Sequence, residues 1–84
     1  MYKATITVTL RPSILDPEGK AIEHALHSLT LNDVSNVRVG KHISLHVAAT
    51  DEAAARTVVE EACRKLLSNP VMEDYLFTLE RIES

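Results

Sequence analysis

Residues 2–10, YKATITVTL, decide the fold, because they alternate strictly between two kinds of side chain. The two faces that an extended chain would present are Ala4, Ile6, Val8 and Leu10 on one side and Lys3, Thr5, Thr7 and Thr9 on the other. Period-two alternation in a run rich in Val, Ile and Thr is typical of a half-buried strand. Pro12 ends it, since proline has no N–H to donate to a neighbouring strand.

A helix is predicted next along the chain. Asp16 is a good N-cap and Pro17 a good first helical residue. The apolar side chains that follow recur at helical spacing, at Ile22, Ala25, Leu26 and Leu29. We expect this helix to end near Leu31. Gly19 lies in the first turn of this helix, where glycine lowers helix stability. A glycine at this position therefore requires a structural explanation.

The middle of the chain, VSNVRVGKHISLHVAA (34–49), alternates on either side of Gly40. We interpret it as two antiparallel strands, residues 37–39 and 43–47, joined by a tight turn at Gly40, where glycine can adopt a positive φ. The alternative is a single strand that bends at Gly40.

A second helix, capped by Thr50 or Asp51, is predicted before the last strand. Its apolar stripe comprises Ala55, Val58, Val59, Ala62, Cys63, Leu66 and Leu67. The sequence SNP (68–70) ends it, because Asn suits the C-cap and Pro cannot continue a helix. The run EDYLFTLERI (73–82) predicts the final strand. We expect Val71 or Met72, just before it, to be buried in the core or at a subunit contact.

The predicted order is therefore β-α-β-β-α-β in a single domain spanning residues 1–84. Two helices with one apolar stripe each can cover one face of a four-stranded antiparallel sheet. This is a ferredoxin-like two-layer α+β sandwich. The other face of the sheet carries threonines, Ser44 and two histidines, and it would either meet water or pair with a second copy.

Composition narrows the function classes. Of the 84 residues 45% are hydrophobic and only 4% aromatic, so the core is small and aliphatic and self-association is favoured. A net charge of −3 argues against nucleic acid as a partner. The sequence contains neither an apolar run long enough to cross a membrane nor a signal peptide, so we expect no membrane partner. One cysteine fits a reducing compartment, and we expect a cytoplasmic protein.

No catalytic or metal constellation emerges from the sequence. Cys63 lies on an apolar stripe, where cysteine behaves as a small hydrophobe. His24 and His27 lack further ligands at a known metal spacing, and the other two histidines lie about 13 Å apart along a strand. The two glycines belong to different turns, so no phosphate cradle forms. We expect no catalytic residue, no cofactor site and no metal site, which leaves a binding or assembly module.

Three motifs resemble a known family. LDPEGKAIEHAL (15–26), VRVGK (37–41) and LLSNPVMEDY (66–75) occur in the order and at the intervals of the PurS-type small subunit of phosphoribosylformylglycinamidine synthase. That enzyme is the amidotransferase of de novo purine synthesis. The resemblance covers essentially the whole chain.

The resemblance implies a non-catalytic subunit of a glutamine- and ATP-dependent ligase complex. Such a subunit bridges the large synthetase subunit and the glutaminase subunit, supports ammonia transfer between them, and forms a homodimer or tetramer. It binds no cofactor itself, whereas the complex uses ATP, magnesium and glutamine. An ACT-type small-molecule-binding domain is the alternative, although the glycine-rich turn usual after its first strand is missing here.

The resemblance also implies which positions make assembly contacts. They are Asp16, Gly19, Arg38, Gly40, Lys41, Asn69, Pro70, Glu73 and Tyr75. Gly19 would let another surface approach the backbone closely. Arg38 and Lys41, on either side of a hairpin tip, would reach an acidic or phosphate-bearing partner surface or simply be solvated. Glu73 would cap a helix or pair across an interface.

Overall fold

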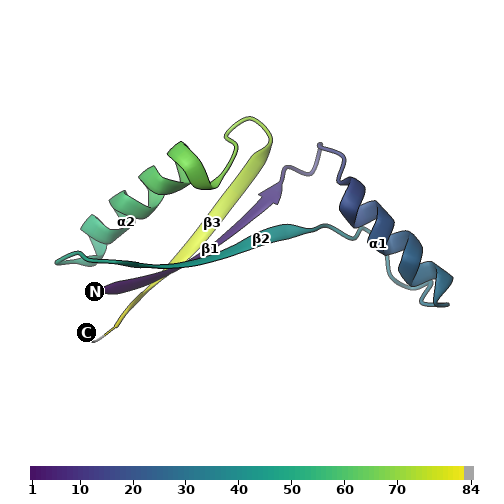
Figure 1. The fold of residues 1–84 in the computed structure, drawn as a ribbon, viewed down its shortest axis with the longest axis horizontal. Helices are drawn as coiled ribbons and strands as arrows, with labels where there is room; N and C mark the ends of the chain where they lie inside the picture. The colour runs from purple at the N-terminus through teal and green to yellow at the C-terminus, as the bar shows by residue number, and fades with distance from the viewer. Residues whose placement is uncertain (83–84) are drawn as a thin grey trace.

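The computed structural model describes residues 1–82 (Figure 1). It contains a three-stranded antiparallel sheet, one helix that covers a face of this sheet, and one helix that extends away from it. The elements in chain order are β1 (Tyr2–Leu10), α1 (Pro17–Ser28), β2 (Gly40–Val47), α2 (Glu52–Ala62), a π-helical turn (Cys63–Leu67) that continues α2, and β3 (Glu73–Arg81).

The strand β1 lies at the centre of the sheet, in the order β2-β1-β3. In this register Thr5 of β1 lies opposite Ser44 of β2 and Thr78 of β3. Ala4, Ile6 and Val8 are fully buried, which confirms the two-sided pattern of β1. The strand is central because its apolar face meets the core along almost its whole length.

The helix α2 supplies the other half of the core. The Ala54 N–H donates to Asp51 Oδ1 (2.8 Å), so Asp51 is the cap. Ala55, Val59 and Cys63, spaced four residues apart, are fully buried against the sheet. The outer part of the predicted stripe, including Val58, is exposed. One helix is therefore enough to bury β1 but leaves apolar surface uncovered.

The sheet differs from the prediction on the β2 side. Within residues 1–82 it has three strands, so the four-stranded ferredoxin-like arrangement is not confirmed. The hairpin at Gly40 is wrong: residues 37–39 form no strand, Gly40 begins β2, and its φ is not positive. Glycine is required there for a different reason, because a Cβ at Gly40 would lie 2.7 Å from the Val8 carbonyl oxygen of β1.

The helix α1 does not lie on the sheet. Figure 1 shows it projecting beyond the ends of β1 and β2. The radius of gyration is 16.5 Å, whereas a compact chain of this length has about 12 Å. On its apolar stripe Ile22 is 39% exposed and Leu29 67% exposed. The expectation that both helices cover the sheet is therefore wrong for the single chain. At 12 and 11 residues, α1 and α2 are also too short to cross a membrane.

The helix α1 ends in a Schellman motif that has an unusual residue in its left-handed position. The Leu31 N–H donates to the Leu26 carbonyl (3.0 Å) and the Thr30 N–H to the His27 carbonyl (3.0 Å). Thr30 has a φ of 69°, a position that glycine usually occupies because a β-branched side chain is strained there.

Thr30→Gly should therefore strengthen the end of α1. Relief of left-handed strain outweighs the greater freedom of glycine in the unfolded chain, and we expect a gain of about 0.5–1 kcal/mol. The measurement is the free energy of opening from hydrogen exchange of the Leu31 amide. Lys20→Gly, in ordinary helical backbone, is the control and should weaken α1 by about 1 kcal/mol. Faster exchange at Leu31 in Thr30→Gly would contradict the strain argument.

Candidate functional site

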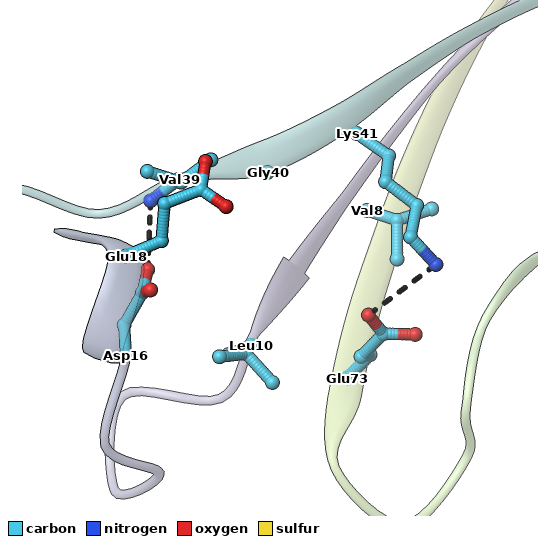
Figure 2. Close-up of a pocket in the computed structure, with 8 residues that line it drawn as sticks. All are labelled: Val8, Leu10, Asp16, Glu18, Val39, Gly40, Lys41 and Glu73. Atoms are coloured by element: carbon cyan, nitrogen blue, oxygen red, sulfur yellow. Dashed lines mark hydrogen bonds and ion pairs between the residues drawn. The ribbon is translucent and has the colours of Figure 1, made fainter.

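The three sequence motifs meet at one end of the sheet. The N-terminus of α1, the residues that lead into β2, and the start of β3 surround the end of β1 (Figures 1 and 2). We call residues 15–19, 37–41 and 69–75 the motif site. It encloses an open hollow of about 370 Å³, lined by Val8, Leu10, Asp16, Glu18, Val39, Gly40, Lys41 and Glu73.

Asp16 holds two of these segments together. Its Oδ1 accepts a hydrogen bond from the Gly19 N–H (2.9 Å) and its Oδ2 accepts one from the Val39 N–H (2.8 Å). These two bonds, first that from Val39, hold the pKa of this buried carboxyl below its ordinary value, and the charge of Arg38 acts in the same direction. The predicted helix cap is confirmed, and the same side chain also fixes the entry to β2.

Gly19 is explained by a close approach of backbone. A Cβ at this position would lie 2.3 Å from the Val37 carbonyl oxygen. The sequence predicted that another surface would approach here, and the surface that does so is the chain's own residue 37. Glycine is tolerated in the first turn of α1 because no larger residue leaves room for this contact.

Two more side chains of α1 bind the same extended segment. Glu23 Oε1 accepts from the Val37 N–H (3.1 Å), and His27 Nε2–H donates to the Val34 carbonyl (2.7 Å). The bond from Val37 is the main cause that lowers the pKa of Glu23. Together with Asp16 these residues form what we call the α1 clasp: Asp16, Glu23 and His27, each bonded to the backbone of residues 34–39.

Arg38 and Lys41 do not flank a hairpin tip. Arg38 Nη2 donates to the carbonyls of Arg11 (3.0 Å) and Ile14 (2.9 Å), so it secures the loop between β1 and α1. Lys41 Nζ lies 3.7 Å from Glu73 Oε2, across the end of β1 (Figure 2). The two cations are thus used within the chain, although most of the Lys41 side chain is exposed.

Residues 69–73 form a closed turn that leads into β3. Asn69 Oδ1 accepts from the Val71 N–H (2.9 Å), and Glu73 Oε1 accepts from the Asn69 N–H (2.7 Å). Glu73 therefore caps this turn rather than a helix. Val71 is 76% exposed and Met72 41% exposed, so burial in the core is wrong for both, and a subunit contact stays a prediction.

Arg11 is a residue of this site that sequence reasoning missed. Its Nη2 donates to the Pro70 carbonyl (2.6 Å), its Nε lies 3.3 Å from Asp74 Oδ1, and its own carbonyl accepts from Arg38. It thereby connects the second and third motifs. In the sequence, Arg11 is only a charged residue between a strand and Pro12. Nothing around it indicates this role, because the residues that it binds are 27 and 59 positions away.

Tyr75, the last matched position, lies half-buried on the inner face of β3. Its ring stacks on that of Phe77, with centroids 6.5 Å apart and planes 14° from parallel. Tyr75 packs against the core from its rim, on the same face of β3 as Phe77.

The charged side chains around the hollow of the motif site are mainly acidic. Asp16, Glu18 and Glu73 outnumber Lys41 around the hollow, and this charge disfavours a phosphate group. Cys63 lies elsewhere in the core, where burial and the charge of Glu60 raise its pKa and make it a weak nucleophile. Within residues 1–82, no three His, Cys, Asp or Glu side chains are placed to share a metal ion.

Comparisons with known proteins agree on one family. Residues 3–81 match the family model of PurS, phosphoribosylformylglycinamidine (FGAM) synthase. The PurS subunit of phosphoribosylformylglycinamidine synthase from Bacillus subtilis is 45% identical over 82 residues, which cover 98% of this chain and 96% of the relative. The crystal structure of PurS from Methanocaldococcus jannaschii has a TM-score of 0.88 at 42% identity and covers 99% of this chain and 100% of its own. A chain in the structure of PurLQS from Thermotoga maritima has a TM-score of 0.87 at 37% identity, covering 94% and 96%.

Gly19→Ala should weaken the contact between α1 and residues 34–39. In an open helix this change stabilises, but here the new methyl group must displace backbone, at a cost of about 1–3 kcal/mol. Hydrogen exchange of the Val37 and Val39 amides should become faster. Lys20→Ala, at the next and exposed position, is the control and should leave both amides unchanged. An unaltered Val37 amide in Gly19→Ala would contradict the close approach.

The α1 clasp should open in acid. The pKa values of Asp16 and Glu23 are lowered in the folded chain, so the stabilisation they provide is complete above their ordinary values and is lost as pH falls through the folded values. Chemical shifts of the Val37 and Val39 amides should change together below about pH 4, the ordinary range of carboxyl groups.

Asp16→Asn and Glu23→Gln are the controls for the acid response. An amide has one carbonyl oxygen and does not ionise in this range, so each variant should remove the corresponding part of the pH dependence. If both variants retain the full transition, other groups cause it.

Proposed function

The chain belongs to the PurS family and is a subunit of phosphoribosylformylglycinamidine synthase, the glutamine- and ATP-dependent amidotransferase of purine biosynthesis, and from this premise we propose that it bridges the synthetase and glutaminase subunits without catalysing a reaction itself. Ammonia passes from one partner to the other within the assembly that this subunit holds together. The ATP, magnesium and glutamine of the complex bind to the other subunits, and the complex works in the cytoplasm.

One observation carries the proposal: the helix α1 stands away from the sheet and is fixed in that position by hydrogen bonds of its own side chains. Three polar side chains, those of Asp16, Glu23 and His27, bind it to residues 34–39. A monomeric protein gains nothing from fixing an apolar helix in water, because each large aliphatic side chain gains about 1.5–3 kcal/mol on full burial. An assembly subunit gains a preformed docking element.

The same reasoning supports a homodimer or tetramer. Ile22 and Leu29 leave apolar surface along one side of α1, and Leu15 and Leu31, before and after the helix, are exposed as well. Val58 of α2 and Leu66 of the π-helical turn that continues it leave a second exposed apolar stripe. A second copy related by a two-fold axis covers both stripes at once, since an isologous contact uses the same surfaces twice.

The ACT-type alternative finds less support. An amino-acid ligand carries its own carboxylate, and the hollow of the motif site is lined by Asp16, Glu18 and Glu73. This charge favours protein assembly over ligand regulation.

The experiment that tests the proposal is reconstitution with the synthetase and glutaminase subunits. Glutamine-dependent formation of phosphoribosylformylglycinamidine should require this chain, and the chain alone should hydrolyse neither glutamine nor ATP. The double variant Ile22→Asp with Leu29→Asp should sediment as a monomer and lose activity in the mixture, while its circular dichroism stays unchanged because both positions are exposed in the single chain.

The control for this variant is His24→Asp, on the opposite side of α1. It adds a similar charge to the helix without touching the apolar stripe, and it should assemble normally. Full activity of the mixture without this chain would overturn the bridging role. An oligomer that survives both aspartates would overturn the assignment of α1 to the contact between copies.

A further inference from the structure

The strand β3 is an edge strand with a free row of backbone groups. The Arg11 N–H donates to the Met72 carbonyl (2.9 Å) and the Ile82 N–H donates to the Met1 carbonyl (3.0 Å), and both bonds extend the β1–β3 register by one residue. Hydrogen-bonded pairs alternate in an antiparallel ladder. The N–H and C=O groups of Tyr75, Phe77 and Leu79 therefore point away from β1, toward the open edge.

Arg56 and Glu60 of α2 and Arg64 of the π-helical turn form a row of charges at four-residue spacing, and the two arginines of this row lie beside β3. The guanidinium of Arg56 lies 5.2 Å from the centre of the Phe77 ring. Arg64 and Tyr75 line one open hollow at the start of β3, of about 430 Å³. Neither arginine takes part in any ion pair within residues 1–82. Glu60 lies between them at the same helical spacing.

The spacing of this row matches that of an extended chain. Arg56, Glu60 and Arg64 recur every four residues, which is about 6 Å along a helix. Residues i, i+2 and i+4 of a strand share one face and recur about every 6.6 Å. A segment added beside β3 would place its i, i+2 and i+4 side chains opposite the three charges in turn.

We propose that β3 accepts an extended segment of a partner subunit as a fourth strand, with acidic side chains at i and i+4 opposite Arg56 and Arg64 and a basic or neutral side chain at i+2 opposite Glu60. Backbone groups of β3 supply the affinity and the charge row supplies direction and register. This inference rests on the proposed bridging role. It specifies the charge pattern of the segment by which one of the two partner subunits binds.

A second copy of this chain fits the same edge poorly. Two β3 strands paired about a two-fold axis near Phe77 would bring Arg56 against the Arg56 of the other copy, because this side chain lies over that ring. Like charges directly opposite one another are destabilising. The edge of β3 is therefore free for a different protein, while the apolar stripe of α1 serves the contact between copies.

The position of the added strand can be tested by photocrosslinking in the reconstituted complex. Thr78→p-benzoylphenylalanine places the probe on β3, and Ser44→p-benzoylphenylalanine places the matched control on β2, since both residues lie opposite Thr5. Light should join position 78 to a synthetase or glutaminase segment that carries acidic residues four apart. Capture of a second copy at position 78, or of no chain in an active complex, would overturn the inference.

The charge row is tested by the double variant Arg56→Glu with Arg64→Glu. Titration of the partner should show binding weakened by about tenfold or more, whereas Lys65→Glu, on the same helix and paired with Glu61, should bind as the unchanged chain does. Arg64→Glu alone keeps the Arg56–Phe77 contact and should show part of the loss at unchanged thermal stability.

The two proposals fail in different ways. If the unchanged chain does not join the two subunits, the bridging role is wrong. If the unchanged chain joins them and the double variant binds equally well, only the role of β3 is wrong.

Discussion

The two hydrogen bonds accepted by the Asp16 carboxylate are the constraint on which the rest of the structure depends. One caps α1 through Gly19 and the other binds Val39 just before β2. Since the two oxygens of one carboxylate are rigidly joined, the start of α1 and the entry to β2 take a fixed relative position. Glu23 and His27 continue the same attachment along the helix. Because of this clasp, α1 points away from the sheet instead of folding back over it.

That orientation decides what the chain can do. A sheet with one covering helix buries Ile6, Val8 and their neighbours but leaves two free strand edges and two apolar helix stripes. Free edges and apolar stripes invite association with other chains. In our proposal for this subunit of phosphoribosylformylglycinamidine synthase, these surfaces bind the other chains of the complex. Three residues of the family motifs, Asp16, Gly19 and Glu73, lie behind these surfaces. They determine the shape of the surfaces because they position the backbone.

Particular residues show how far the sequence predicts this structure. The strict alternation of residues 2–10 predicted β1, Asp16 was correct as a helix cap, and Asp51 was one of the two caps predicted for the second helix, because such signals act between neighbours in the chain. Gly40 was misread, since the sequence does not distinguish a glycine that turns from a glycine that lets β1 approach at 2.7 Å. Arg11 had no signal at all, because its partners are distant in sequence.

The sequence by itself determined both helices, the strands around residues 2–10, 43–47 and 73–81, and the family, because periodicity, caps and motif spacing are local properties of the chain. Only the tertiary structure decided that the segment before β2 binds α1 instead of forming a fourth strand. That choice depends on three side chains of α1 meeting backbone groups at residues 34–39, and such a contact between distant segments leaves no periodic trace in the sequence. The apolar stripe of α1 is visible in the sequence as a buried face. Whether it is buried by the same chain or by another one is a property of the fold alone.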